Sequence, residues 1–225
     1  MELLRQSAFL LRKDLLLEVR RRESLLAMFF FAALLLFIFH FAFDIAPERA
    51  AEMAPGLLWV AAIFTGTLGL TQLFQAEREN HCLEALLLGP VDRGALFLSK
   101  LVFNFLLMLL VELVVFPLFW VLFNLESWRA LPSLVLVALL GTLGFCALGT
   151  LFSAATLRAR ARELLLPLVL FPLMIPVILA TIRAMEIVLR TGQFGEAQAW
   201  LRLLVGFDVI FVTAGFLVFE WAIEE

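Results

Sequence analysis

The sequence lacks a phosphate-binding loop, because no Gly-x-x-x-x-Gly-Lys-[Ser/Thr] pattern occurs in its 225 residues. In many ATPases this loop surrounds the phosphates of ATP with backbone N–H groups and a lysine. We therefore expect the chain to be neither an ATPase nor an enzyme on its own. If ATP drives its work, a separate subunit must hydrolyse it.

Metal-binding and redox residues are also scarce, with two cysteines and two histidines. Cys82 falls in a charged segment and Cys146 in an apolar run, and no Cys-x-x-Cys or His-Glu-x-x-His motif occurs. We expect no metal site and no disulfide, with Cys146 acting as a small packing residue. His40 and His81 lie apart in the sequence. For His40, contact with a cofactor such as haem and contact with water are both open, and we favour water.

Charged residues make up only 16% of the chain, whereas hydrophobic residues make up 64% and the mean hydropathy is +1.03. A soluble domain has about 45–50% apolar residues, so this composition is typical of a membrane protein. An apolar helix needs about 20 residues to cross the hydrocarbon core. The sequence predicts an all-α polytopic membrane protein, one transmembrane domain over 1–225, with six spans at 25–43, 55–74, 101–123, 131–155, 164–182 and 203–223.

The basic residues are distributed unevenly between alternate loops. Twelve of the seventeen Lys and Arg residues lie in the N-terminal segment, the second loop and the fourth loop, and five lie on the other side. Because Lys and Arg are enriched in cytoplasmic loops, this distribution predicts that both termini and the loop after the second span are cytoplasmic.

The N-terminal segment 1–24 mixes charges with apolar residues at helical spacing: Leu4, Ala8, Leu11, Leu15 and Val19. This pattern predicts an amphipathic helix on the inner leaflet, where its basic end would contact anionic lipid headgroups. A cleaved signal peptide is the alternative. The apolar run 25–43 is longer than a signal core and five more spans follow, so we reject cleavage.

The segment 76–91 is the most distinctive charged interruption between spans. Read as a helix, it places Leu83, Leu86 and Leu87 on one stripe, and Gly89-Pro90 would end it. We expect a short amphipathic helix that docks a soluble partner, although a solvated loop is the alternative. The expected docking residues are Glu77, Arg78, Glu79, Leu83, Glu84, Leu86 and Leu87.

Three polar residues fall within the predicted spans: Asn104, Glu112 and Asp208. A carboxyl group in the bilayer is unfavourable and should face protein or a cavity. For Glu112, at the middle of the third span, a functional contact and a structural hydrogen bond to a neighbouring helix are equally open. We expect Asp208 to pair with Arg202 or Arg183, and a contribution to an outer binding surface is the alternative.

Other signals concern how the spans pack and end. Small residues predict close helix contacts, and they are Ala62, Gly66, Gly69, Gly141, Gly144, Gly149 and Ser153. Pro167, Pro172 and Pro176 should bend or break the fifth span. The segment 183–202 is predicted to be a re-entrant or interfacial segment on the periplasmic side.

The charged segment resembles the signature of ABC-2-type permeases, in which an acidic-basic-acidic start leads to a Leu-Glu pair, leucines and a proline. Here these are Glu77-Arg78-Glu79, Leu83-Glu84, Leu86-Leu87 and Pro90. In that family the segment is the coupling helix that docks into the ATPase subunit. This chain has His81-Cys82 where the family usually has a small Gly-Thr or Gly-Ser pair.

Two further runs resemble the CcmB family, the permeases of the cytochrome c maturation system. They are Ala54-Pro55-Gly56-Leu57-Leu58-Trp59-Val60-Ala61, and Phe207-Asp208-Val209-Ile210-Phe211 with the terminal Glu224-Glu225. The resemblance implies a homodimeric permease in the bacterial inner membrane. It also implies as partners an ATPase subunit (the A component), the haem-handling C and D components and a periplasmic haem chaperone, with no nucleic acid. Haem would be a transported or partner-bound ligand, and ATP would bind only to the ATPase.

The functional hypothesis is therefore a subunit that couples ATP hydrolysis by its partner to haem delivery, or to release of the haem-loaded chaperone. Two alternatives stay open. One is a generic ABC-2 exporter of a lipid, drug or polysaccharide, and the other is a scaffold of the haem-delivery complex that transports nothing.

Overall fold

A computed structural model describes residues 2–43, 47–75, 89, 91–125, 130–157 and 162–224. These residues form helices and connecting turns, without a strand in the described ranges. The helices are α1 (Glu2–Arg21), α2 (Glu23–Phe43), α3 (Pro47–Gln72), α6 (Arg93–Leu122), α7 (Leu131–Ala155), α8 (Arg162–Thr191), the short η2 (Gly195–Ala197) and α9 (Gln198–Glu224). Six of them are long and apolar enough to cross a membrane, which confirms the predicted all-α polytopic fold.

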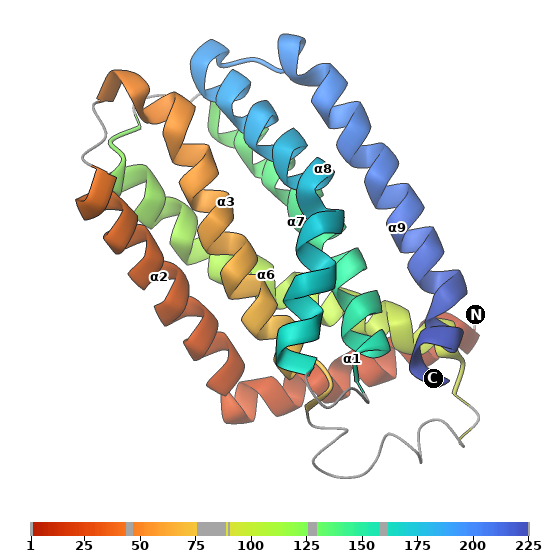
Figure 1. Cartoon of the computed structure of the whole chain (residues 1–225). Coiled ribbons are helices and arrows are strands. Elements are labelled where there is room, and N and C mark those ends of the chain that lie inside the picture. The colour runs from red at the N-terminus through yellow and green to blue at the C-terminus, as the bar shows by residue number, and fades with distance from the viewer. Residues whose placement is uncertain are drawn as a thin grey trace.

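The six spans form one bundle, and α1 lies across one end of it (Figure 1). Both termini lie at this end, which we call the α1 end. Helix α7 is central, since it packs against α3, α6, α8 and α9, whereas α2 packs against α3 and α6 at the edge. The expected apolar stripe of α1 points only partly into the bundle, because Leu11 and Leu15 pack against the core and the other three residues do not. Leu4, Ala8 and Val19 are exposed, and α1 also packs against the bundle through Leu10 and Asp14.

Small residues let the central helices approach closely, as predicted. A Cβ atom added to Gly141 of α7 would lie 2.6 Å from both the Thr181 hydroxyl oxygen and the Trp59 ring. Ser153, further along α7, donates a hydrogen bond of 2.8 Å to the carbonyl oxygen of Leu70 on α3. Because lipid provides no hydrophobic drive between helices, such close packing and interhelical hydrogen bonds hold the bundle together.

The second span begins earlier than predicted. We expected Pro55 to open it, but α3 begins at Pro47 and contains Pro55 in its interior. A proline lacks the N–H that would bond to the carbonyl one turn before, and it usually ends or kinks a helix. Here Pro55 is buried against the rest of the bundle, and tertiary packing maintains the helix across it.

The fifth span is also longer than predicted, so the boundary predicted at 182/183 for a re-entrant or interfacial segment 183–202 is wrong. Helix α8 continues to Thr191, and its three prolines do not end it. Charges within its last turns are paired along the helix, because Glu186 contacts Arg183 at 2.7 Å and Arg190 at 3.7 Å. The chain then turns at Gly192, where φ is +70°, and α9 begins at Gln198.

We predict that Gly141→Ala destabilises the protein, because the new methyl group would overlap Trp59 and Thr181. Overpacking of this kind costs about 1–3 kcal/mol, which thermal unfolding of the purified protein in detergent would detect as a lower midpoint. Gly206→Ala is the matched control, since nothing lies within 4 Å of a Cβ there. An unchanged midpoint for Gly141→Ala would contradict the predicted packing.

Candidate functional site

The predicted docking segment lies largely outside the described residues. This applies to all seven expected docking residues: Glu77, Arg78, Glu79, Leu83, Glu84, Leu86 and Leu87. The structure does describe what precedes and follows the segment. The chain leaves α3 through Leu73 and Phe74 and enters α6 at Arg93, and both points lie at the α1 end.

Helix α1 holds the start of α6 in place. The Gln6 side chain of α1 accepts a hydrogen bond of 3.0 Å from the backbone N–H of Asp92. Asp92 is in turn the N-cap of α6, and its carboxylate accepts a hydrogen bond of 3.2 Å from the backbone N–H of Ala95. A cap of this kind satisfies an N–H group that has no partner inside the helix.

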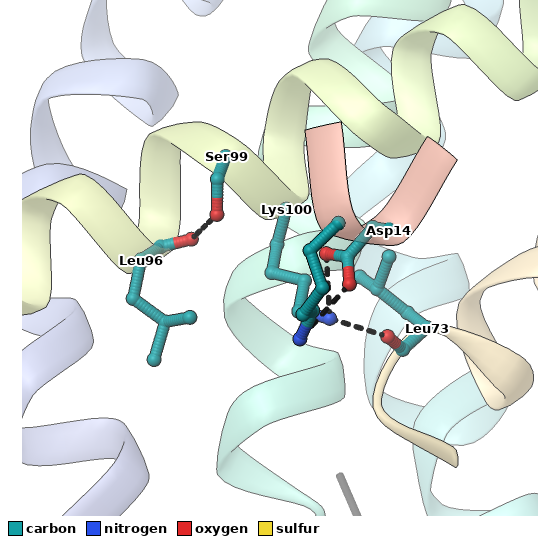
Figure 2. A network of polar contacts seen from close by, with 6 residues as sticks. Asp14, Leu73, Leu96, Ser99 and Lys100 are labelled. Carbon is teal, nitrogen blue, oxygen red and sulfur yellow. Dashed lines mark hydrogen bonds and ion pairs between the residues drawn. The ribbon is translucent and has the colours of Figure 1, made fainter. Parts of the chain in front are cut away.

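A buried ion pair joins α1, α3 and α6 at the same end (Figure 2). The Lys100 ammonium of α6 lies 2.9 Å from the Asp14 carboxylate of α1 and donates a hydrogen bond of 3.2 Å to the Leu73 carbonyl oxygen after α3. It also lies 5.1 Å from the centre of the Phe74 ring, a cation–π distance. The side chains of Lys100 and Asp14 are only 2% and 5% exposed. Lys100 therefore connects three elements in a place where water screens little.

A polar cavity of about 150 Å³ lies beside the ion pair. Glu18 and Arg21 of α1, Gln72 of α3 and Lys100 of α6 contribute to its wall. Glu18 also accepts a hydrogen bond of 2.9 Å from the backbone N–H of Leu25, which fixes the start of α2. The α1 end is thus a platform of four helices held together by polar contacts.

This ion pair was not among the predicted sites, although the sequence contains a signal for it. Asp14 follows Leu10 by four residues and so lies on the same face of α1, where an isolated charge has to find a partner. Lys100 was counted only as a basic loop residue, because the third span was predicted to begin after it. The structure starts α6 at Arg93, which places Lys100 two turns inside the helix.

Of the predicted intramembrane residues, Asn104 lies one turn beyond Lys100 on α6. It is fully buried near Gly69 of α3, and neither its amide nitrogen nor its oxygen has a hydrogen-bond partner among the described residues. Glu112, two turns further on, accepts a hydrogen bond from the Thr142 hydroxyl of α7. Asn104 and Glu112 therefore contact different helices.

The expected pairing of Asp208 with Arg202 or Arg183 is wrong. Asp208 is buried against Gly144 of α7, and neither carboxylate oxygen has a partner among the described residues. Arg183 pairs with Glu186 instead. Six residues separate Arg202 from Asp208, which is about 600° of helical rotation and turns the two side chains to different faces of α9. The three predicted polar residues do not form one site.

Within the described ranges, no group of three or more His, Cys, Asp or Glu side chains is arranged to hold a metal ion. His40 lies at the far end of α2, edge-on to Phe123 at 5.9 Å between ring centres.

Comparison with known proteins decides the family. The family model described as CcmB protein matches residues 5–224. The chain belongs to the CcmB family. Among its relatives, heme exporter protein B of Pseudomonas aeruginosa is 31% identical over 197 residues, 88% of each chain. The protein of the same name in Rhodobacter capsulatus is 30% identical over 200 residues, 88% of each chain. The one in Haemophilus influenzae is 30% identical over 179 residues, 79% of this chain and 80% of the relative.

We predict that Lys100→Met destabilises this CcmB-family protein by about 3–5 kcal/mol, because it leaves the buried Asp14 carboxylate without its main partner. Thermal unfolding in detergent measures the effect. The double variant Lys100→Met with Asp14→Leu should recover much of the loss, since an apolar pair needs no charge partner.

Lys13→Met is the matched control for this prediction. Lys13 contacts the same carboxylate at 3.1 Å, but its side chain is 37% exposed, so the loss should stay at about 1 kcal/mol or less. Equal losses for Lys13→Met and Lys100→Met would contradict the special role of the buried pair.

Proposed function

We propose that this chain is the membrane-spanning permease subunit of an ABC transporter for cytochrome c biogenesis. It would couple ATP hydrolysis by a separate ATPase to haem delivery or to release of a haem-loaded periplasmic chaperone. The observation that carries the proposal is membership of the CcmB family over almost the whole chain, with relatives named heme exporter protein B. The missing phosphate-binding loop agrees with an ATPase on another chain.

The α1 end is the cytoplasmic end in this proposal. Both termini lie there (Figure 1). The same end carries the basic residues of α1 and of the start of α6, namely Arg5, Arg12, Lys13, Arg20, Arg21, Arg22, Arg93 and Lys100. The enrichment of Lys and Arg in cytoplasmic segments supports this orientation in the bacterial inner membrane. The exposed apolar residues of α1 would then rest in the inner leaflet.

The segment 76–91 is the proposed contact with the ATPase. Movement of the ATPase would push this segment, and the ends of α3 and α6 would receive the force directly. Lys100 supports this step because it holds the end of α3, the first turns of α6 and α1 as one unit. Ion-pair and hydrogen-bond networks of this kind can carry coupling between distant sites. An ABC-2-type dimer, with the haem-handling C and D components beside it, completes the proposed assembly.

The central test replaces Arg78 and Glu84 together by Ala. We expect the ATPase subunit to copurify poorly with the variant and c-type cytochromes, detected by haem staining of membrane proteins, to be strongly reduced. The control is Glu196→Ala, an exposed residue of η2 at the opposite end, which should leave both unchanged. Intact ATPase binding together with normal cytochrome maturation in the double variant would refute the docking role.

Two further measurements separate the alternative functions. Deletion of the gene should remove all c-type cytochromes and nothing else, whereas a lipid, drug or polysaccharide exporter would leave them intact. Reconstitution with the ATPase should give a turnover that changes when the haem chaperone is added. A scaffold that transports nothing would leave the rate unchanged.

A further inference from the structure

An apolar groove runs along the surface of the bundle between α6 and α7. Its volume is about 570 Å³, and its wall extends from Leu106 to Val121 on α6 and from Leu131 to Leu139 on α7. The α6 wall is about 22 Å long at the rise of an α-helix, which is most of the hydrocarbon thickness of a bilayer. Leu113 and Val121 in this wall are 71% and 76% exposed, so the groove opens outward.

Glu112 is the one ionisable residue among the described residues that line this groove. Thr142 donates a hydrogen bond to its Oε1 atom, and Oε2 has no hydrogen-bond partner among the described residues. Ionisable groups at this depth face protein or water rather than lipid tails, because hydrocarbon offers them no hydrogen bond. A lipid tail would fill the groove but would leave the Oε2 atom of Glu112 without a hydrogen-bond partner.

Two other occupants fit the groove poorly. Contact between the same grooves of two copies around a twofold axis would place one Glu112 against the other, and two ionised carboxylates in contact would repel. Haem needs a ligand for its iron and cations for its propionates. Among the described residues, those that line the groove include no His, Cys, Met, Tyr, Lys or Arg.

The shape of the groove suits a helix. Leu106, Leu110, Leu113 and Pro117 follow one another at spacings of three and four residues, so they form a ridge along α6. Leu131, Val135 and Ala138 form a second ridge along α7. A third helix can pack by inserting its side chains into the space between these two ridges. In membranes, one polar contact within an apolar interface commonly fixes the register of such helices.

We propose that the groove between α6 and α7 binds a transmembrane helix of a different membrane subunit of the same complex, an apolar helix with one hydrogen-bond donor at the level of Glu112. This inference rests on the proposed function, since it takes the partner to belong to the haem-delivery complex. It assigns the α6–α7 face to a partner in the membrane and leaves the α1 end to the ATPase.

Photo-crosslinking in native membranes of the intact complex tests the proposal. Benzoylphenylalanine replaces Leu113 in the groove, and in the control it replaces Leu217, which is 66% exposed on α9. We expect the Leu113 probe to form an adduct with a transmembrane segment of another subunit, and mass spectrometry should find a donor side chain in that segment. The Leu217 probe should not crosslink to that segment. Adducts with lipid alone or with a second copy, or no adduct at all, would overturn the proposal.

Variants of Glu112 test the polar contact, with the probe kept at Leu113. Glu112→Leu should reduce the adduct about tenfold, the scale of one hydrogen bond between membrane helices, whereas Glu112→Gln should keep most of it because an amide can still accept a hydrogen bond. ATPase copurification should be normal in both variants, which separates this test from a failure of the proposed function. An equal adduct yield in the two variants would count against the role of Glu112.

A second test of the proposal fills the groove with a larger side chain and leaves Glu112 unchanged. Leu110→Trp adds bulk to the wall, where Leu110 is 48% exposed, and should abolish the adduct formed by a probe at Val121. A normal adduct in this variant would show that the partner does not lie in the groove.

Discussion

The buried ion pair between Lys100 and Asp14 is the contact on which the α1 end depends. A lysine ammonium taken out of water needs both a counter-ion and hydrogen bonds. Lys100 finds the first on α1 and the second on the carbonyl of Leu73 after α3. One side chain therefore determines how α1, α3 and α6 meet, at the two points where the chain leaves and re-enters the bundle around the segment 76–91. Any force applied to that segment would act on a unit whose parts are already joined.

Beyond the α1 end, the bundle is organised around α7. Two buried polar residues of neighbouring helices, Glu112 and Asp208, lie against this helix. Gly141 and Gly144 allow Trp59 and Asp208 to approach its backbone, while Thr142, between them in sequence, turns toward Glu112. A helix with small residues on several faces can be surrounded by neighbours, because no bulky side chain holds them away. Glu112 and Asp208 thus contact α7 on different sides, whereas Asn104 lies beside α3, so these three described residues do not form a continuous polar path. In our proposal this arrangement suits a subunit that transmits movement and binds other subunits.

The predictions that came true depended on short stretches of sequence. An apolar run of about 20 residues is a sufficient condition for a span, and α7 begins and ends where its run does. The errors arose where a local rule competed with packing. Pro55 looked like a helix start, and the charges after 182 looked like the end of a span. The structure places Pro55 inside α3 and pairs Glu186 with Arg183 and Arg190 along α8, so both helices extend further.

The sequence by itself determined the class of the protein, the number of its spans and the family, since each of these is carried by composition or by neighbouring residues. Only the tertiary structure decided which polar side chains meet. The pairing of Lys100 with Asp14, the inward position of Asp208 and the groove beside Glu112 all depend on how each helix is rotated and where it crosses its neighbours. Hydropathy does not contain that information, because a span that is apolar on nearly all sides has no preferred face until other helices pack against it.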